Sequence, residues 1–114
     1  MALPSNLRQE VEQLLTKYCE KRVPHKIKDQ VRVGFDIRGN SLTLFEERPQ
    51  FRNEGMWVKI VVAQFRFDSK TSHWTLFCAD RNSRWHEYIG LQSSKYIEHL
   101  LREVDRDPTR MFWG

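Results

Sequence analysis

Residues 32–47, RVGFDIRGNSLTLFEE, decide the fold, because they encode a β-hairpin that sets the direction and the two faces of a sheet. Val33, Phe35 and Ile37 alternate with polar or small residues, a spacing of two that is typical of a half-buried strand. The pair Gly39-Asn40 fits a two-residue hairpin turn. Closing this turn places Arg38 opposite Ser41, Ile37 opposite Leu42, Phe35 opposite Leu44, Val33 opposite Glu46 and Arg32 opposite Glu47.

Three further strands are predicted after the hairpin, over residues 57–67, 73–79 and 84–89. The first of them carries apolar residues on both faces, which indicates a central strand, and simple alternation puts Lys59 on the face of Val61 and Phe65. No crossover helix separates one strand from the next, so we expect an antiparallel sheet.

Apolar residues at helical spacing predict one helix on each side of the strand region. The first covers residues 5–22, and the second begins after a cap at Ser93 or Ser94 and ends at Asp107-Pro108. We therefore expect an α+β fold: a five-stranded antiparallel sheet of meander type, with an N-terminal and a C-terminal helix packed on one face. Residues 1–114 are expected to form a single domain.

The charges are spread evenly along the chain, which argues against a basic tail for nucleic acid. The net charge is +4, and residues 1–57 and 58–114 each contribute half of it. No apolar run approaches the roughly 18 residues of a membrane span, and the first residues do not resemble a secretion signal. We expect a cytoplasmic protein with no membrane partner.

Metal or cofactor chemistry has no sequence signature. Two cysteines, Cys19 and Cys78, lie in unrelated segments, and the four histidines are scattered without ligand spacing. No cofactor and no metal site is expected.

A polar patch near one end of the sheet is the first candidate site. The hairpin register turns Glu46 toward the core, where a carboxylate needs a cation, and Arg48 lies two residues on, on the same face. In the last strand, Arg84, His86 and Tyr88 form a polar face opposite Trp85 and Ile89, which we expect in the core. An imidazole, a guanidinium and a phenol suit the binding of an anion. The predicted binding residues are Glu46, Arg48, Arg84, His86 and Tyr88.

A non-enzymatic binding or protein-interaction module is the function that this patch favours, and two other functions stay open. A hydrolase or nuclease-like enzyme would use Glu46, Asp80 and His86, with His86 as general acid or base. Spacing indicates no nucleophile, since Ser83 and Cys78 qualify by residue type alone. A nucleic-acid-binding protein would use aromatic and basic side chains on the uncovered sheet face. A homodimer through that face or through residues 111–114 is a further candidate assembly.

Three segments together resemble a bacterial family known only as family 3024 of domains of unknown function. They contain Glu46, Arg48 and Pro49; Trp85, His86 and Tyr88; and Phe112 with Gly114. The likeness covers nearly the whole chain. It implies a small free-standing protein in which these segments belong together, and it implies no activity.

Overall fold

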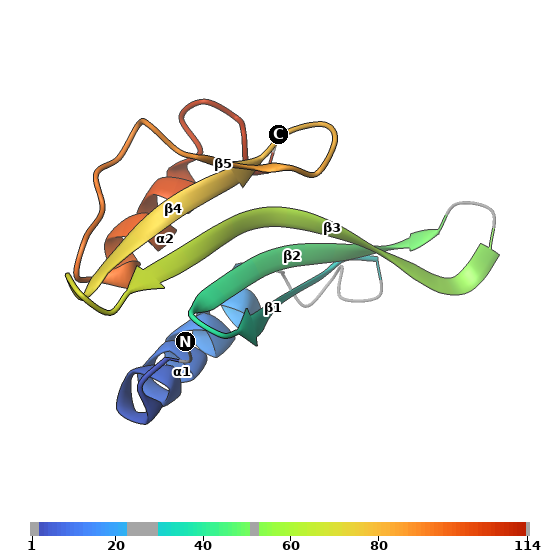
Figure 1. Ribbon diagram of the computed structural model, residues 1–114. Coiled ribbons are helices and arrows are strands. Elements are labelled where there is room, and N and C mark those ends of the chain that lie inside the picture. Colours follow the sequence, from blue (N-terminus) through green and yellow to red (C-terminus); the bar gives the residue numbers. More distant parts are fainter. Residues whose placement is uncertain (1–2, 23–29, 51–52, 114) are drawn as a thin grey trace.

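The computed structural model describes residues 3–22, 30–50 and 53–113, and Gly114 of the resemblance lies outside them. These residues form two helices and five strands, arranged as in Figure 1. Their bounds are α1 Ser5–Arg22, β1 Arg32–Arg38, β2 Ser41–Gln50, β3 Asn53–Asp68, β4 His73–Ala79, β5 Trp85–Glu87 and α2 Ile97–Arg106. The predicted α+β class is confirmed.

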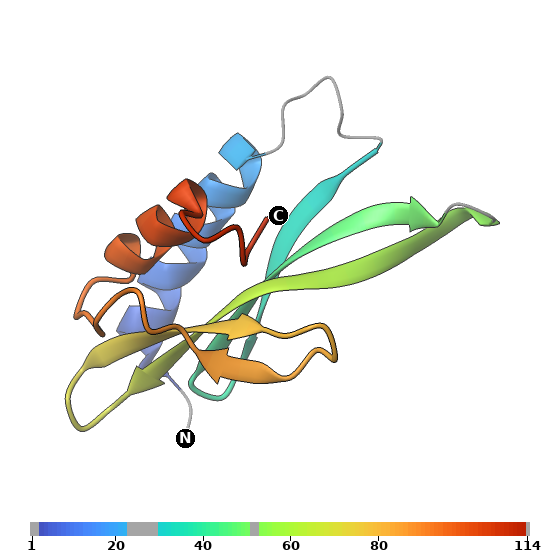
Figure 2. The ribbon, with the colours of Figure 1, turned by 90° about the horizontal axis from the view of Figure 1, so that it is seen from above.

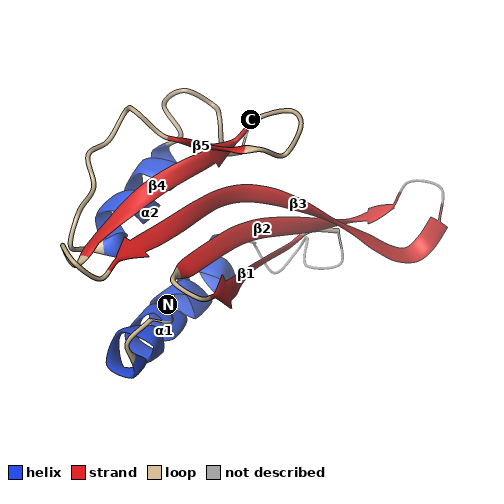
Figure 3. Ribbon diagram, in the orientation of Figure 1, coloured by secondary structure: helices blue, strands red, loops and turns tan. Residues whose placement is uncertain are grey.

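The strands form one antiparallel sheet in the order β1-β2-β3-β4-β5 (Figure 3), as a meander requires. The β1–β2 register agrees with the sequence prediction at every pair, from Arg38 with Ser41 to Arg32 with Glu47. Gly39 adopts a positive φ of 61° in the turn between them, a conformation that glycine adopts without steric cost.

Both helices lie on the same side of the sheet (Figure 2), and the hydrophobic core fills the space between them and the strands. Val11 and Leu15 enter it from α1, Leu100 and Val104 from α2. The sheet contributes Leu42, Leu44, Ala63, Phe65, Trp74 and Leu76, each at most 2% exposed. The opposite side of the sheet, which neither helix covers, is called the open face below.

A β-bulge in β3 corrects the predicted faces of this strand. Leu44 pairs with Ala63 but Phe45 pairs with Val61, so Val62 is an extra residue. The bulge shifts the alternation by one position. Lys59 and Val61 therefore lie on the open face, opposite to Phe65, whereas alternation alone had put all three on one face.

The second helix begins later than predicted, at Ile97. Ser94 is held as a backbone partner of Trp74, through hydrogen bonds in both directions. Its hydroxyl accepts a hydrogen bond from the Tyr96 N–H and lies 2.9 Å from His99 Nδ1. Tyr96 occupies the cap position without a side-chain cap. The predicted cap at Ser93 or Ser94 is thus wrong, because Ser94 extends the sheet. No helix of the described part of the chain is long and apolar enough to cross a membrane.

The C-terminal segment docks onto its own domain through Asp107. This residue ends α2 in a left-handed conformation, and its carboxylate accepts hydrogen bonds from the backbone N–H groups of Phe112 and Trp113. Phe112 is buried against the ring of Tyr88, and Arg22 of α1 lies over the ring of Trp113.

Phe112 and its exposed neighbour Met111 provide a matched test of this docking. Phe112→Ala should lower the free energy of unfolding by about 3–5 kcal/mol, because it empties a buried aromatic site. Met111→Ala, at a side chain that is 54% exposed, should cost less than about 0.5 kcal/mol. Urea unfolding followed by circular dichroism measures both, and equal effects would contradict the docked tail.

Candidate functional site

Glu46 and Arg48 form an ion pair on β2. Arg48 Nε donates to Glu46 Oε1 at 3.3 Å, and the Glu46 side chain is only 17% exposed. Glu46 pairs across the sheet with Val33 and Ile60, on the side of the helices, as the hairpin register predicted. The half-buried carboxylate thus has a cation beside it.

Asp80 and His86 meet at the β4–β5 turn. His86 Nε2 lies 2.7 Å from Asp80 Oδ2, while Asp80 Oδ1 accepts the backbone N–H groups of Asn82 and Arg84. Hydrogen bonds lower the pKa of Asp80 below its usual range. The bond from His86 is the largest cause, and the bond from the Arg84 N–H is the next. Ser83 completes the turn with a positive φ of 61°. Both carboxylate oxygens of Asp80 are therefore engaged in holding the turn.

Tyr88 points into the protein and not toward a ligand. Tyr88 is 5% exposed, and its hydroxyl donates to Glu103 Oε2 at 2.8 Å. Burial is the main cause that raises the pKa of Tyr88, and this hydrogen bond is the second. The two faces of residues 84–89 are thus the reverse of the prediction at three positions: Tyr88 lies in the core, Trp85 on the open face, and Ile89 is 94% exposed. The chain leaves β5 after Glu87, so alternation no longer governs Ile89.

The five predicted binding residues do not come together as one patch. Glu46 and Arg48 lie on β2, Arg84 and His86 at β5, and both β3 and β4 run between these strands. Three interstrand steps of about 4.8 Å amount to about 14 Å across the sheet. Asp80 and His86 do meet, whereas Glu46 lies apart from them. Within residues 3–22, 30–50 and 53–113, no group of three His, Cys, Asp or Glu side chains is arranged to hold a metal ion.

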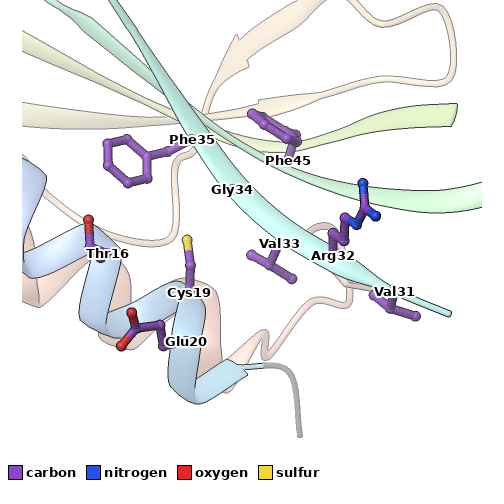
Figure 4. A pocket seen from close by; sticks show the side chains of 9 residues that line it. All are labelled: Thr16, Cys19, Glu20, Val31, Arg32, Val33, Gly34, Phe35 and Phe45. Atoms are coloured by element: carbon purple, nitrogen blue, oxygen red, sulfur yellow. The ribbon is translucent and has the colours of Figure 1, made fainter. Parts of the chain in front are cut away.

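A cavity of about 660 Å³ lies between α1 and the edge strand β1, and sequence reasoning did not find it. Figure 4 shows Thr16, Cys19 and Glu20 on the helix side and Val33 and Phe35 on the strand side. Burial raises the pKa of the Cys19 thiol to about 11, so this thiol is a weak nucleophile at neutral pH.

Three aromatic rings of the open face each have a cation lying over them. Arg32 lies 3.7 Å from the ring centre of Trp57, Lys59 4.0 Å from that of Phe45, and Arg66 3.8 Å from that of Phe77. These pairs involve four strands, β1 to β4. The sequence shows aromatic and basic residues in this region, but their pairing depends on the bulge, which sets the side of Lys59.

A groove of about 610 Å³ opens beside the middle pair. Lys59 Nζ donates to Asp36 Oδ2 at 2.8 Å, and Gln64 donates to the Thr43 hydroxyl at 3.0 Å. Trp85 from β5 also lines the groove. The groove thus combines rings, a cation and hydrogen-bonding groups on a face that no helix covers.

Gly34 shapes the floor of this face. A side chain at Gly34 would meet the ring of Phe45 at 2.9 Å, so the ring can approach β1 this closely only because Gly34 has no side chain. Phe45 is 8% exposed although it lies outside the main core.

These features define a small α+β domain with a one-sided antiparallel sheet and a ring-lined open face. The family model of a domain of unknown function (DUF3024) matches residues 3–114, and the chain belongs to this family. No curated protein and no solved structure matches the chain.

The thiol of Cys19 reports on the cavity between α1 and β1. With a pKa of about 11, its alkylation by iodoacetamide should still rise about tenfold per pH unit between about pH 8 and pH 10, because only the thiolate reacts. Mass spectrometry of the peptide that contains Cys19 gives the rate, and glutathione is the reference thiol. A rate that levels off below about pH 9 would contradict the buried environment.

The Asp80 carboxylate should stabilise the protein at neutral pH and lose this effect in acid. Since its folded pKa is lowered, the contribution is complete above the pKa of the unfolded chain and disappears as the pH falls through the folded pKa. Asp80→Asn keeps an oxygen for the two backbone donors and removes the charge. Wild type should therefore be more stable than this variant at neutral pH, and the difference should shrink on acidification in urea titrations.

His86→Ala is the companion variant for this titration. It removes the main cause of the shift, so it should raise the Asp80 pKa, as measured by NMR of the carboxyl carbon. A stability difference independent of pH, together with an unchanged Asp80 pKa in His86→Ala, would show that this pair is not coupled.

Proposed function

We propose that this protein is a non-enzymatic, cytoplasmic binding module that binds single-stranded nucleic acid on the open face of its sheet. The observation that carries the proposal is the set of three cation–ring pairs: Arg32 with Trp57, Lys59 with Phe45, and Arg66 with Phe77. All three lie on the side of the sheet away from the helices.

A guanidinium plane stacked on an aromatic ring offers its second face to a nucleobase. Unstacked bases bind to aromatic side chains and to arginine planes in sheet-based modules, and the arginine charge also attracts phosphate. Because Trp57 and Phe77 lie beneath them, Arg32 and Arg66 are already held in place and lose little further freedom on binding. The groove beside Lys59 supplies donors and acceptors for base edges.

The charge on the open face favours stacking over phosphate contact. The register puts four basic side chains on it, Arg32, Arg38, Lys59 and Arg66, and four acidic ones, Asp36, Glu47, Asp68 and Glu87. The two numbers are equal, so these strand residues carry no net charge. Binding should still weaken with salt, but with a logarithmic slope no steeper than about −3, since at most four cations can release counterions.

The length of the face suits a short single strand. From Trp57 to Arg66, β3 spans nine residue steps, or about 30 Å of strand at about 3.3 Å per residue. Single-strand sites on comparable small folds take about 4–16 nucleotides.

Fluorescence anisotropy with a labelled, mixed-sequence single strand of about 12 nucleotides tests the proposal. Wild type should bind at low salt. Arg66→Gln and Phe77→Leu should each weaken binding about tenfold or more, because stacking contributes about 1–3 kcal/mol per base. Arg102→Gln removes the same charge from an exposed position on α2, on the helix side, and should change affinity less than about twofold.

Two outcomes would overturn the assignment. One is the absence of binding by wild type at low salt. The other is equal weakening by Arg66→Gln and Arg102→Gln, which would indicate attraction by net charge alone and no site on the open face.

A further inference from the structure

The β2–β3 hairpin extends beyond the rest of the sheet as a two-stranded arm (Figures 1 and 2). The last pair between β1 and β2 is Arg32 with Glu47, whereas β2 and β3 remain paired as far as Gln50 with Asn53. On its other side, β3 pairs with β4 only over Gln64–Asp68. Residues 53–63 of β3 thus form a long strand edge with no strand partner in the described part of the chain.

The arm exposes apolar side chains at alternate positions. Met56, Val58 and Ile60 are 54%, 43% and 43% exposed. The pairs Ile60 with Glu46 and Val58 with Arg48 place Ile60 and Val58 on one face of the arm, the side of the helices. Alternation along β3 puts Met56 on the same face. The other exposed large apolar residues, Ile89, Tyr96 and Met111, lie outside β3 and do not alternate along a strand.

The backbone groups on this edge are also arranged for pairing. In an antiparallel sheet, successive residues direct their N–H and C=O groups to opposite neighbours. The hairpin turn makes Arg38 and Ser41 a hydrogen-bonded pair, so Leu42, Leu44, Glu46 and Arg48 bond toward β3. Their partners Val58 and Ile60 then point to β2. The groups of Trp57, Lys59 and Val61 consequently point outward, toward the unpaired edge.

We propose that a second copy of this chain pairs antiparallel with this edge, around a two-fold axis at Val58. In this register Val58 lies opposite Val58 of the second copy, and Met56 lies opposite Ile60, so one continuous apolar stripe is covered on one face. Lys59 lies opposite Trp57 on the other face, where a cation and a ring attract each other. Trp57 and Lys59 also become the hydrogen-bonded pairs, in agreement with their outward-pointing groups.

Neighbouring registers lack this complementarity, so this edge fits a second copy of itself best in the register centred on Val58. An axis at Lys59 would place two ammonium groups directly opposite each other, an unfavourable like-charge pair. An axis at Trp57 would leave Ile60 without an apolar partner. With the two-fold axis at Val58, the edge is therefore complementary to an antiparallel copy of itself in shape, charge and hydrogen bonding.

The dimer is independent of nucleic acid, so its test uses the protein alone. Sedimentation of wild type over a range of concentrations should show a mass that approaches twice the 13.8 kDa of the chain. Val58→Lys sets two charges against each other at the axis and should weaken the dimer about tenfold or more. Ile89→Lys introduces the same charge at a residue that is 94% exposed and outside β3, and should leave the dimer unchanged.

Disulfide cross-linking tests the register and does not depend on the lysine variant folding. Cβ atoms of directly opposite residues lie about 4.5–5.5 Å apart, close enough for a disulfide after small shifts. Val58→Cys should form a covalent dimer on mild oxidation, and a mixture of Met56→Cys and Ile60→Cys should cross-link faster than either alone. Wild type, with Cys19 and Cys78, is the blank, and Ile89→Cys the control for an exposed thiol.

A wild type that stays monomeric up to millimolar concentration would overturn the proposal. So would a Val58→Lys variant that dimerises as well as wild type, or a Val58→Cys variant that cross-links no faster than Ile89→Cys.

Discussion

The two-residue turn at Gly39-Asn40 is the constraint on which the rest of the structure depends. It closes β1 against β2 in one register, and a slip of one residue would turn every side chain of the hairpin to the opposite face. Val33, Phe35 and Ile37 then pack toward the helices, and Asp36 and Gly34 face away. Because each later strand pairs with the strand before it, the register of this hairpin also determines which side of the whole sheet faces the helices.

The helices cover only one face, and the open face therefore has to protect its own rings. Phe45 does so by lying over Gly34 and under Lys59, and Trp57 and Phe77 by lying under arginines. The bulge at Val62 makes this arrangement possible, because it turns Lys59 to the side of Phe45 while Ala63 and Phe65 stay in the core. The same bulge lies where β3 separates from β4, so it also marks the base of the projecting arm.

The sequence was sufficient for the parts of the fold that depend on local patterns. The hairpin register, the antiparallel, meander-like sheet and the first helix follow from alternation, turn chemistry and helical spacing. The bulge was not predictable, since an extra apolar residue in an apolar strand produces no recognisable sequence pattern. Ser94 was misassigned because serine suits both a helix cap and a loop, and its pairing with Trp74 is a long-range contact. The prediction of a single patch failed for a similar reason. Alternation tells which face of its own strand a residue lies on, but it does not tell how many strands separate Glu46 from His86.

The residues by which the chain resembles its family make contacts that hold the fold together. Arg48 donates a hydrogen bond to Glu46, and Tyr88 donates one to Glu103 and packs its ring against Phe112. The backbone N–H of Phe112 in turn donates to Asp107. Such contacts stabilise the fold and leave few free groups for a ligand. A half-buried ring, two cations and an unpaired strand edge occur elsewhere, along Trp57, Lys59 and Arg66 of β3. The motif residues therefore account for how the sheet and helices hold together, and the proposed binding surface uses other residues, on β3 and its neighbouring strands.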